Sequence, residues 1–309
     1  MIRQEDVTII IPHLGATPQQ VSSLGFCLDS IYETYPDMRV IVVKNSGEPD
    51  ENYSYLHQLH QNCVWINLED QGQCKAVNAA AATVSTPWIM ISNDDMIYAE
   101  GWFEQLIKPL GMIYVDNKYV DMDEFSPHSI VRTSDVTRVK YENILCISPQ
   151  LIEPIDGAPT FKKFFAGGAG GDFNKDAWLG YAKNHVGGFI RTGFNLPFLI
   201  RKDVWDLVGG YDVNYDPWGS NSDSDLEYKL KLAGVQPFQN VDCPVYHFSQ
   251  TSGTFEPRNR PSWEKNWQYF IDKWGFPRTD DGIWQATFMI PSKEEGRKFQ
   301  PWWEGFYAK

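Results

Sequence analysis

The sequence predicts an α/β protein with a mostly parallel central sheet flanked by helices. Short apolar runs alternate with amphipathic stretches of helical period along the first hundred residues. Strands that are joined by crossover helices pair in parallel, and parallel strands are apolar on both faces. The chain has 309 residues, 42% of them hydrophobic and 22% charged. This composition suits a globular protein with one large α/β domain, or with a domain and a smaller lobe.

Four candidate strands and three candidate helices alternate in the first hundred residues. The strands are expected at residues 7–11, 39–43, 64–66 and 88–91, and the helices at about 18–31, 55–59 and 72–84. Thr17 and Pro18 are typical of a helix start, as an N-cap followed by a proline in the first turn. The alternation indicates a Rossmann-like nucleotide-binding half. No Gly-rich fingerprint follows the first strand and no P-loop lysine is present, which disfavours a dinucleotide-binding protein or an ATPase.

The fourth strand is the one around which the chain is organised. Its apolar run, Trp88 to Ile91, ends in Asn93, Asp94 and Asp95. The carboxyl ends of parallel strands are where open α/β sheets bind ligands. Carboxylates at that edge can hold a hard divalent cation, and the cation can hold a diphosphate. A capping turn is the alternative, because Asp and Asn are also common in turns and at helix starts.

The net charge of the chain limits the classes of partner that it can bind. With 40 acidic and 27 basic residues the net charge is -13, so the surface as a whole repels nucleic acid and anionic lipid. An acidic protein that binds an anionic nucleotide needs a local cation.

The five cysteines show no spacing typical of zinc sites or disulfide frameworks. The N-terminal apolar run is too short for a signal peptide or a membrane span, and we expect a cytoplasmic protein.

The rest of the chain carries further motifs. Pro12 and His13 follow the first strand, and a Gly-Gly-Tyr-Asp turn stands at residues 209–212. The acidic stretch 223–226 (Asp-Ser-Asp-Leu) opens a candidate helix. The remaining motif residues, in chain order, are Asp70, Gly72, Asn78, Trp218, Gly219, His247 and the Lys-Trp-Gly run 273–275.

The order of these motifs resembles that of a family 2 glycosyltransferase of the GT-A fold, over most of residues 7–250. Asp70, Gly72 and Asn78 are similar to its Asn-x-Gly, five residues, Asn pattern. Residues 93–95 fall on its D-x-D motif, and residues 209–212 match its GGFD element. Residues 223–226 resemble the E-D-x-D-L motif that carries the catalytic base. His247 resembles the distal metal-ligand histidine, and residues 273–275 resemble a frequent C-terminal KWG element.

The resemblance implies roles for individual residues. Asp223 would be the base that deprotonates an acceptor hydroxyl, and Asp95 and His247 would hold Mn²⁺ or Mg²⁺. An imidazole beside a carboxylate favours manganese somewhat. Acceptor contacts would come from Trp218, Gly219 and Asp225. The nucleotide contacts would be Pro12, His13, Asn45, Asp70, Gly72, Asn78, Asn93 and Asp94.

The expected domain is a GT-A unit over residues 1–250. Its nucleotide-binding half covers residues 1–110 and its acceptor half 144–250, with a polar insertion at 111–143 between them. An aromatic-rich extension at 251–309 would pack on the domain, although its tryptophans could also dimerise the protein or form a sugar or membrane-surface platform.

The implied activity is metal-dependent, inverting transfer of a sugar from a nucleotide-diphosphate sugar, UDP-linked by preference, to a hydroxyl of a glycan or similar acceptor. Three departures from the family pattern keep other readings open. Lys44 and Asn45 replace a frequent Asp pair, Asn93 replaces the first acid of D-x-D, and Ser222 replaces the glutamate before the base. A carbohydrate-binding relative with a decayed site is one alternative. A sugar-phosphate nucleotidyltransferase is another, but it would need a Gly-rich N-terminal loop with an activating cation, which residues 12–17 lack.

Overall fold

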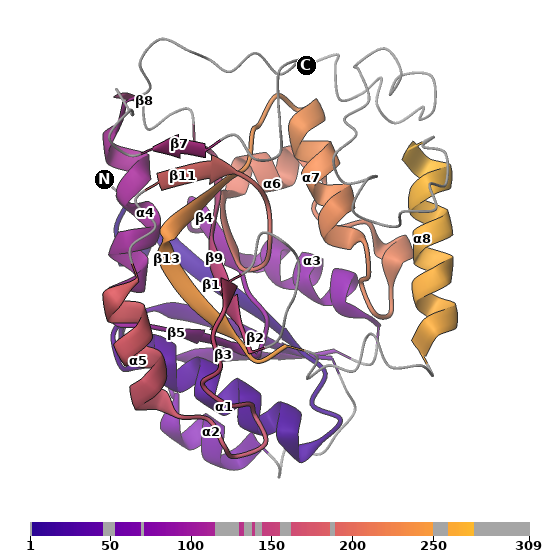
Figure 1. Cartoon of the computed structure of the whole chain (residues 1–309). Coiled ribbons are helices and arrows are strands. Elements are labelled where there is room, and N and C mark those ends of the chain that lie inside the picture. Colours follow the sequence, from indigo (N-terminus) through magenta and orange to yellow (C-terminus); the bar gives the residue numbers. More distant parts are fainter. Residues whose placement is uncertain are drawn as a thin grey trace.

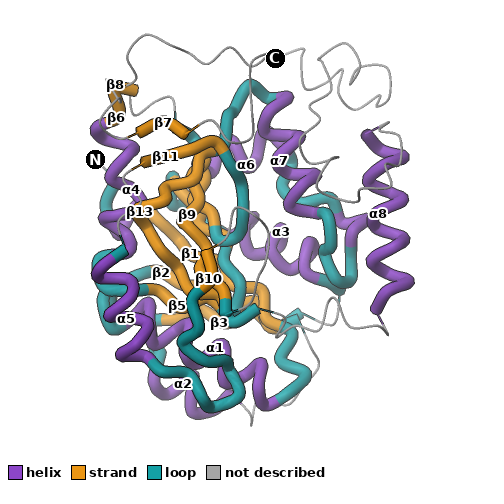
Figure 2. Tube along the Cα trace, in the orientation of Figure 1, coloured by secondary structure: helices purple, strands orange, loops and turns teal. Residues whose placement is uncertain are grey.

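A computed structural model of the chain describes residues 2–45, 53–68, 71–114, 130–132, 138–139, 144–154, 162–185, 189–249 and 259–274. These residues form a curled, mostly parallel sheet with helices packed around it (Figure 1; Figure 2). The predicted α/β class is therefore confirmed. Within the described residues no helix is both long enough and apolar enough to cross a membrane.

The N-terminal half alternates strands and helices as the sequence predicts. After a short 3-10 helix at Gln4–Asp6, the elements in chain order are β1 (Val7–His13), α1 (Pro18–Tyr32), β2 (Arg39–Lys44), α2 (Ser54–Leu59), β3 (Cys63–Asn67), α3 (Gln73–Thr83) and β4 (Trp88–Ile91). The start of α1 has the expected cap, because the Thr17 side chain accepts a hydrogen bond from the Gln20 backbone N–H and the Gln20 side chain accepts one from Thr17.

The second half adds antiparallel strands and the helices that carry the remaining motifs. Its elements in chain order are β5 (Met96–Tyr98), α4 (Trp102–Met112), β6 (Ile113–Tyr114), β7 (Ile130–Arg132), β8 (Arg138–Val139), β9 (Cys146–Glu153), β10 (Lys162–Lys163), α5 (Lys175–Asn184), β11 (Phe189–Thr192), β12 (Phe198–Arg201), α6 (Lys202–Val208), η6 (Val213–Tyr215), α7 (Ser222–Leu232), β13 (Phe238–His247) and α8 (Arg260–Trp274). Most of the expected insertion at 111–143, and the extension beyond residue 274, lie outside the described residues.

Strand order brings the motif-bearing strands together. The sheet runs β3-β2-β1-β4-β12-β9-β13-β11-β7, with β10 beside β9 and β5 beside β13. Strands β1 to β4 are mutually parallel where they pair, whereas β12 is antiparallel to both β4 and β9. In the antiparallel pair of β5 and β13, His247 lies opposite Met96. Register therefore places the end of β13 beside the residues that follow the acidic tip of β4.

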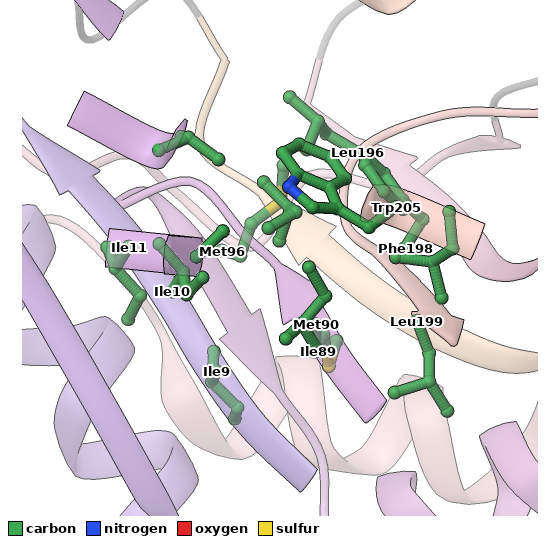
Figure 3. Packing of buried hydrophobic residues seen from close by; sticks show 14 of the residues in the cluster. Ile9, Ile10, Ile11, Ile89, Met90, Met96, Leu196, Phe198, Leu199 and Trp205 are labelled. Carbon is green, nitrogen blue, oxygen red and sulfur yellow. The ribbon is translucent and has the colours of Figure 1, made fainter. Parts of the chain in front are cut away.

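The core is built on the central strands. Ile9 and Ile11 of β1 and Ile89 and Met90 of β4 are fully buried, as parallel strands covered on both faces require (Figure 3). Trp205 of α6 packs over this region in the same cluster. All five cysteines are buried free thiols. This rigid base fixes the ends of β1, β2 and β4, from which the candidate site is made.

Candidate active site

Three polar strand ends meet at the carboxyl edge of the parallel sheet. The backbone N–H of Asn45, just after β2, donates to the carbonyl of His13 at 2.8 Å, and that of Ser92, just after β4, donates to Ile10 at 2.9 Å. His13, Asn45 and the Asn93–Asp95 tip therefore share one edge, as predicted. This is the edge at which α/β sheets bind ligands.

The buried His13 and the half-buried Asp94 form a pair at this edge. His13 is 1% exposed, and its Nδ1 hydrogen-bonds the Asp94 carboxylate. Burial raises the pKa of Asp94, and the bond to His13 acts in the opposite direction. The other ring nitrogen of His13, Nε2, is buried without a partner among the described residues. A buried ring nitrogen of this kind can bond a ligand, which fits the predicted role of His13 in nucleotide binding.

Asp95, His247 and Glu153 form a second cluster beside the first. The Nε2 atom of His247 lies 3.2 Å from Asp95 Oδ2, and its Nδ1 lies 2.7 Å from Glu153 Oε1. Asp95 and Glu153 are each 4% exposed. The backbone N–H of Phe248 donates to the carbonyl of Asp95 at 3.0 Å and ties the end of β13 to the acidic tip. The two side chains predicted to bind metal are thus adjacent.

The electrostatics of this cluster favour positive charge. Burial alone would lower the pKa of His247, but the carboxylates of Asp95 and Glu153 outweigh burial and raise the pKa to about 10. The same two carboxylates can stabilise a bound cation.

The donor set fits a divalent cation that is completed by a ligand. A carboxylate oxygen and an imidazole nitrogen separated by 3.2 Å can bind the same ion, and Glu153 orients the imidazole as outer-shell carboxylates do in metal sites. Within the described residues no group of three His, Cys, Asp or Glu side chains is placed to hold a metal ion. If the site binds a cation, Asp95 and His247 would be its side-chain ligands, and the remaining positions would fall to water and a diphosphate.

Asp223 lies in the first turn of α7, on the other half of the domain. Its Oδ1 accepts a hydrogen bond from the hydroxyl of Tyr211 at 2.6 Å. Burial raises the pKa of Asp223 to about 6, opposed by the bond from Tyr211. A carboxylate of that pKa is still ionised at neutral pH and is a stronger base than an ordinary aspartate. These properties suit the predicted role of a general base.

Asn78 bonds the protein backbone instead of facing open solvent. Its Oδ1 accepts from the backbone N–H of Tyr211 at 2.9 Å, and its Nδ2 donates to the Tyr211 carbonyl at 2.8 Å. The predicted nucleotide contact of Asn78 remains a prediction, and these bonds give its amide a different task, which is to hold the Gly-Gly-Tyr-Asp turn.

The N-terminus of α3 is capped by a loop from the other half of the domain. The Asp216 carboxylate accepts from the backbone N–H groups of Cys74 at 2.7 Å and Lys75 at 3.1 Å. Gly72 has φ +98°, and a Cβ there would lie 2.3 Å from the Asp216 carboxyl carbon. The glycine thus permits the cap. Asp70, the preceding residue of the motif, lies outside the described residues.

The three predicted acceptor residues have different surroundings. Trp218 is half-buried, and Gly219 is buried with φ +69° against Gln73. Asp225 is 0% exposed, and its Oδ1 accepts from Lys273 Nζ at 2.7 Å and Trp274 Nε1 at 2.9 Å. These contacts direct Asp225 toward α8, which stands beside α7 in Figure 1.

Sequence reasoning missed several residues that shape the site. Glu153 carries a weak signal that could have been used, because it is an acid directly after the apolar pair Leu151 and Ile152. The cap formed by Asp216 carries no such signal, since its partner Cys74 lies 142 residues away in the sequence. The Tyr211 hydroxyl carries none either, because its bond to Asp223, 12 residues further on, depends on how α6 and α7 pack.

Comparisons with known proteins agree with the fold of the chain. Residues 8–129 match the family model described as glycosyl transferase family 2. The fold resembles that of GalNAc-T7, solved with UDP, GalNAc and Mn²⁺, with a TM-score of 0.54 and 11% identity over 97% of this chain and 54% of that one. It also resembles the mannosyltransferase PcManGT from Pyrobaculum calidifontis, solved with GDP-Man and Mn²⁺, with a TM-score of 0.50 and 14% identity over 89% of this chain and 66% of that one.

The chain thus spans about half the length of the GalNAc-T7 chain and about two thirds of that of PcManGT. A search of curated proteins finds no significant match. At these identities the two structures show that the fold is shared.

Proposed function

We propose that this chain of the GT-A fold, whose residues 8–129 match the model of glycosyl transferase family 2, is a glycosyltransferase that moves a sugar from a nucleotide-diphosphate sugar to a hydroxyl acceptor with inversion. The observation that carries this proposal is the adjacency of Asp95 and His247, whose side-chain atoms lie 3.2 Å apart at the carboxyl edge of the sheet. These two candidate ligands, with the imidazole of His247 held by Glu153, support a metal-dependent donor site.

The donor would lie along the edge formed by β1, β2 and β4. Pro12 and His13 end β1, Asn45 follows β2, and Asn93 and Asp94 follow β4. The buried Nε2 of His13 can bond a nucleotide base or ribose. The related structures hold UDP in one case and GDP-Man in the other. We prefer a UDP-sugar, because the amide of Asn45 suits a uracil edge.

The reaction needs stabilisation of a leaving diphosphate and removal of one proton. When bound, a divalent cation supplies Lewis acidity and a template for the diphosphate, with Asp95 and His247 as its protein ligands. Asp223 accepts the proton of the attacking hydroxyl as that oxygen bonds to the anomeric carbon. In a single displacement the nucleophile enters opposite the leaving group, so the anomeric configuration inverts.

We propose that Trp218 and Gly219 line the acceptor side, next to the base. A half-buried tryptophan can stack on a sugar ring. The contacts of Asp225 with Lys273 and Trp274 support a structural role. We therefore propose that Asp225 affects the acceptor side only indirectly, through α7, the helix that also carries Asp223.

Calorimetry tests the donor site. Purified protein is titrated with UDP, GDP, CDP and dTDP, each with Mn²⁺ and with EDTA. We expect one diphosphate to bind with Mn²⁺ and to lose at least about tenfold in affinity with EDTA or in Asp95→Asn, because a metal bridge is removed. Asp37→Asn, the same change at an exposed position, is the control and should bind like the wild type. Absence of binding by every nucleotide would contradict the proposal and favour a decayed, glycan-binding protein.

A further inference from the structure

We infer that the Tyr211 hydroxyl is a positioning group for the base Asp223, and that Asn78 and Gly210 hold Tyr211 in place for that purpose. This inference rests on the proposed role of Asp223. The GGFD element that the turn resembles has phenylalanine at the position of Tyr211. A phenylalanine ring could fill the same space but could not bond a carboxylate.

The bond selects one oxygen of the carboxylate. Tyr211 is 2% exposed, and its hydroxyl lies 2.6 Å from Oδ1 of Asp223. Among the described residues Oδ2 of Asp223 has no hydrogen-bond partner, which leaves it as the oxygen that can accept the proton of the acceptor. A carboxylate fixed at one oxygen loses rotational freedom and presents the other in one direction.

The backbone of Tyr211 is clamped from α3. Both polar groups of the Asn78 amide bond the Tyr211 backbone, at 2.9 Å and 2.8 Å. Gly210 makes this approach possible, because it has φ +63° and a Cβ there would lie 2.5 Å from Asn78 Oδ1. Lys229 of α7 donates to the Gly210 carbonyl. The turn is therefore bonded both to α3 and to the helix that carries the base.

The ring of Tyr211 is held as firmly as its backbone. It packs edge-on against Trp205 of α6, with ring centroids 5.4 Å apart and an interplanar angle of 88°. Because the ring is buried and packed, the hydroxyl oxygen has one fixed position. Supports of this kind around a reactive group preserve its geometry. The contacts of the ring do not depend on the hydroxyl, so the hydroxyl can be removed alone.

Burial and two side chains set the pKa of Asp223. Burial raises this pKa, the hydrogen bond from Tyr211 lowers it, and Glu227, one turn further along α7, raises it. The buried thiol of Cys74, whose own pKa is raised, faces Asp223 from α3. Removal of the hydroxyl takes away only the bond that lowers the pKa, since burial and Glu227 stay. The pKa of Asp223 must then rise.

Tyr211→Phe tests the inference, with Tyr269→Phe as a matched control. Tyr269 also donates to a carboxylate, that of Asp212 at 2.9 Å, but it does not contact Asp223. In Tyr211→Phe we expect kcat at pH 8.5 to fall roughly 10- to 100-fold, the size of a lost hydrogen bond to a charged group, with KM for the nucleotide sugar unchanged. The acid limb of the kcat profile should move to higher pH. Tyr269→Phe should change neither.

A second measurement separates this inference from the proposed function. The carboxyl titration of Asp223 is followed by NMR on protein labelled with carbon-13 at aspartate side chains, and it is assigned by its loss in Asp223→Asn. A higher pKa in Tyr211→Phe together with sugar transfer by the wild type supports the inference, whereas a higher pKa without any transfer by the wild type would remove the proposed function and with it the role of Asp223 as base. An unchanged Asp223 titration, or a fall in kcat with an unmoved acid limb, would overturn the inference.

Discussion

Lys273 joins the C-terminal helix to the half of the domain that carries Asp223. Its ammonium lies 2.6 Å from Asp212 Oδ2 and 2.7 Å from Asp225 Oδ1. The side chains of Lys273 and Asp225 are 5% and 0% exposed. Burial alone would raise the pKa of Asp212, but Lys273 outweighs burial and the pKa falls to about 2. Lys273→Met keeps most of the volume of the side chain and removes the charge.

The expected loss of stability follows from the partners that remain. Removing one member of a buried ion pair costs roughly 3–5 kcal/mol, because the other charge is left without compensation. Asp225 retains Lys229 at 3.7 Å and Trp274 at 2.9 Å, and Asp212 retains the Tyr269 hydroxyl at 2.9 Å. The loss should therefore lie near the lower limit, about 3 kcal/mol. For a large domain this corresponds to a fall in Tm of about 6–12 °C.

Thermal unfolding followed by circular dichroism measures this loss. Lys265→Met is the matched control, since Lys265 is exposed on the same helix, and it should change Tm by less than about 2 °C. Adding Asp225→Asn to Lys273→Met should cost less than the sum of the two single changes, because the buried charge is also removed. A Tm for Lys273→Met equal to that of the control would refute the reasoning, because the other contacts of α8 would then suffice to hold the helix.

Two glycine substitutions should change the stability of the protein in opposite directions, and the first of them tests the cap on α3. Gly72→Ala should lower the free energy of unfolding by about 2–3 kcal/mol, because the new Cβ is strained at φ +98° and displaces the Asp216 carboxylate from the helix. Gly180→Ala, inside α5 with open space around the new methyl group, should instead raise it by roughly 0.5–1 kcal/mol. Chemical denaturation measures both, and a Gly72→Ala protein as stable as the wild type would contradict the assigned role of Asp216.

The sequence predicted the parallel half of the fold because local signals suffice there. Apolar runs such as Trp88–Ile91 are buried on both faces and end in polar residues, and a helix such as α1 has its own cap at Thr17. The short antiparallel strands β5 and β11 were missed, since three or four residues carry too little periodicity. Their pairing is set by β13, which is distant in the sequence.

Some parts of the candidate site could likewise be predicted from the sequence, and others could not. Asp95 and His247 were predicted as a pair and lie 3.2 Å apart. The surroundings of Asn78 could not be predicted, because its partner Tyr211 lies 133 residues further along the chain. Side-chain partners of this kind are fixed by how α3 and α6 pack against the sheet, and a sequence pattern contains no record of that packing.

Release of nucleoside diphosphate from nucleotide sugars tests the central claim most directly. Wild type, Asp223→Asn and the control Asp37→Asn are incubated with UDP- and GDP-sugars, Mn²⁺ and a panel of oligosaccharide acceptors. The account predicts release that depends on donor and acceptor in the wild type and the control. In Asp223→Asn release should fall about 100-fold or more, the usual contribution of a general base, while nucleoside diphosphate still binds. No release from any donor by the wild type, or equal release by Asp223→Asn, would contradict it.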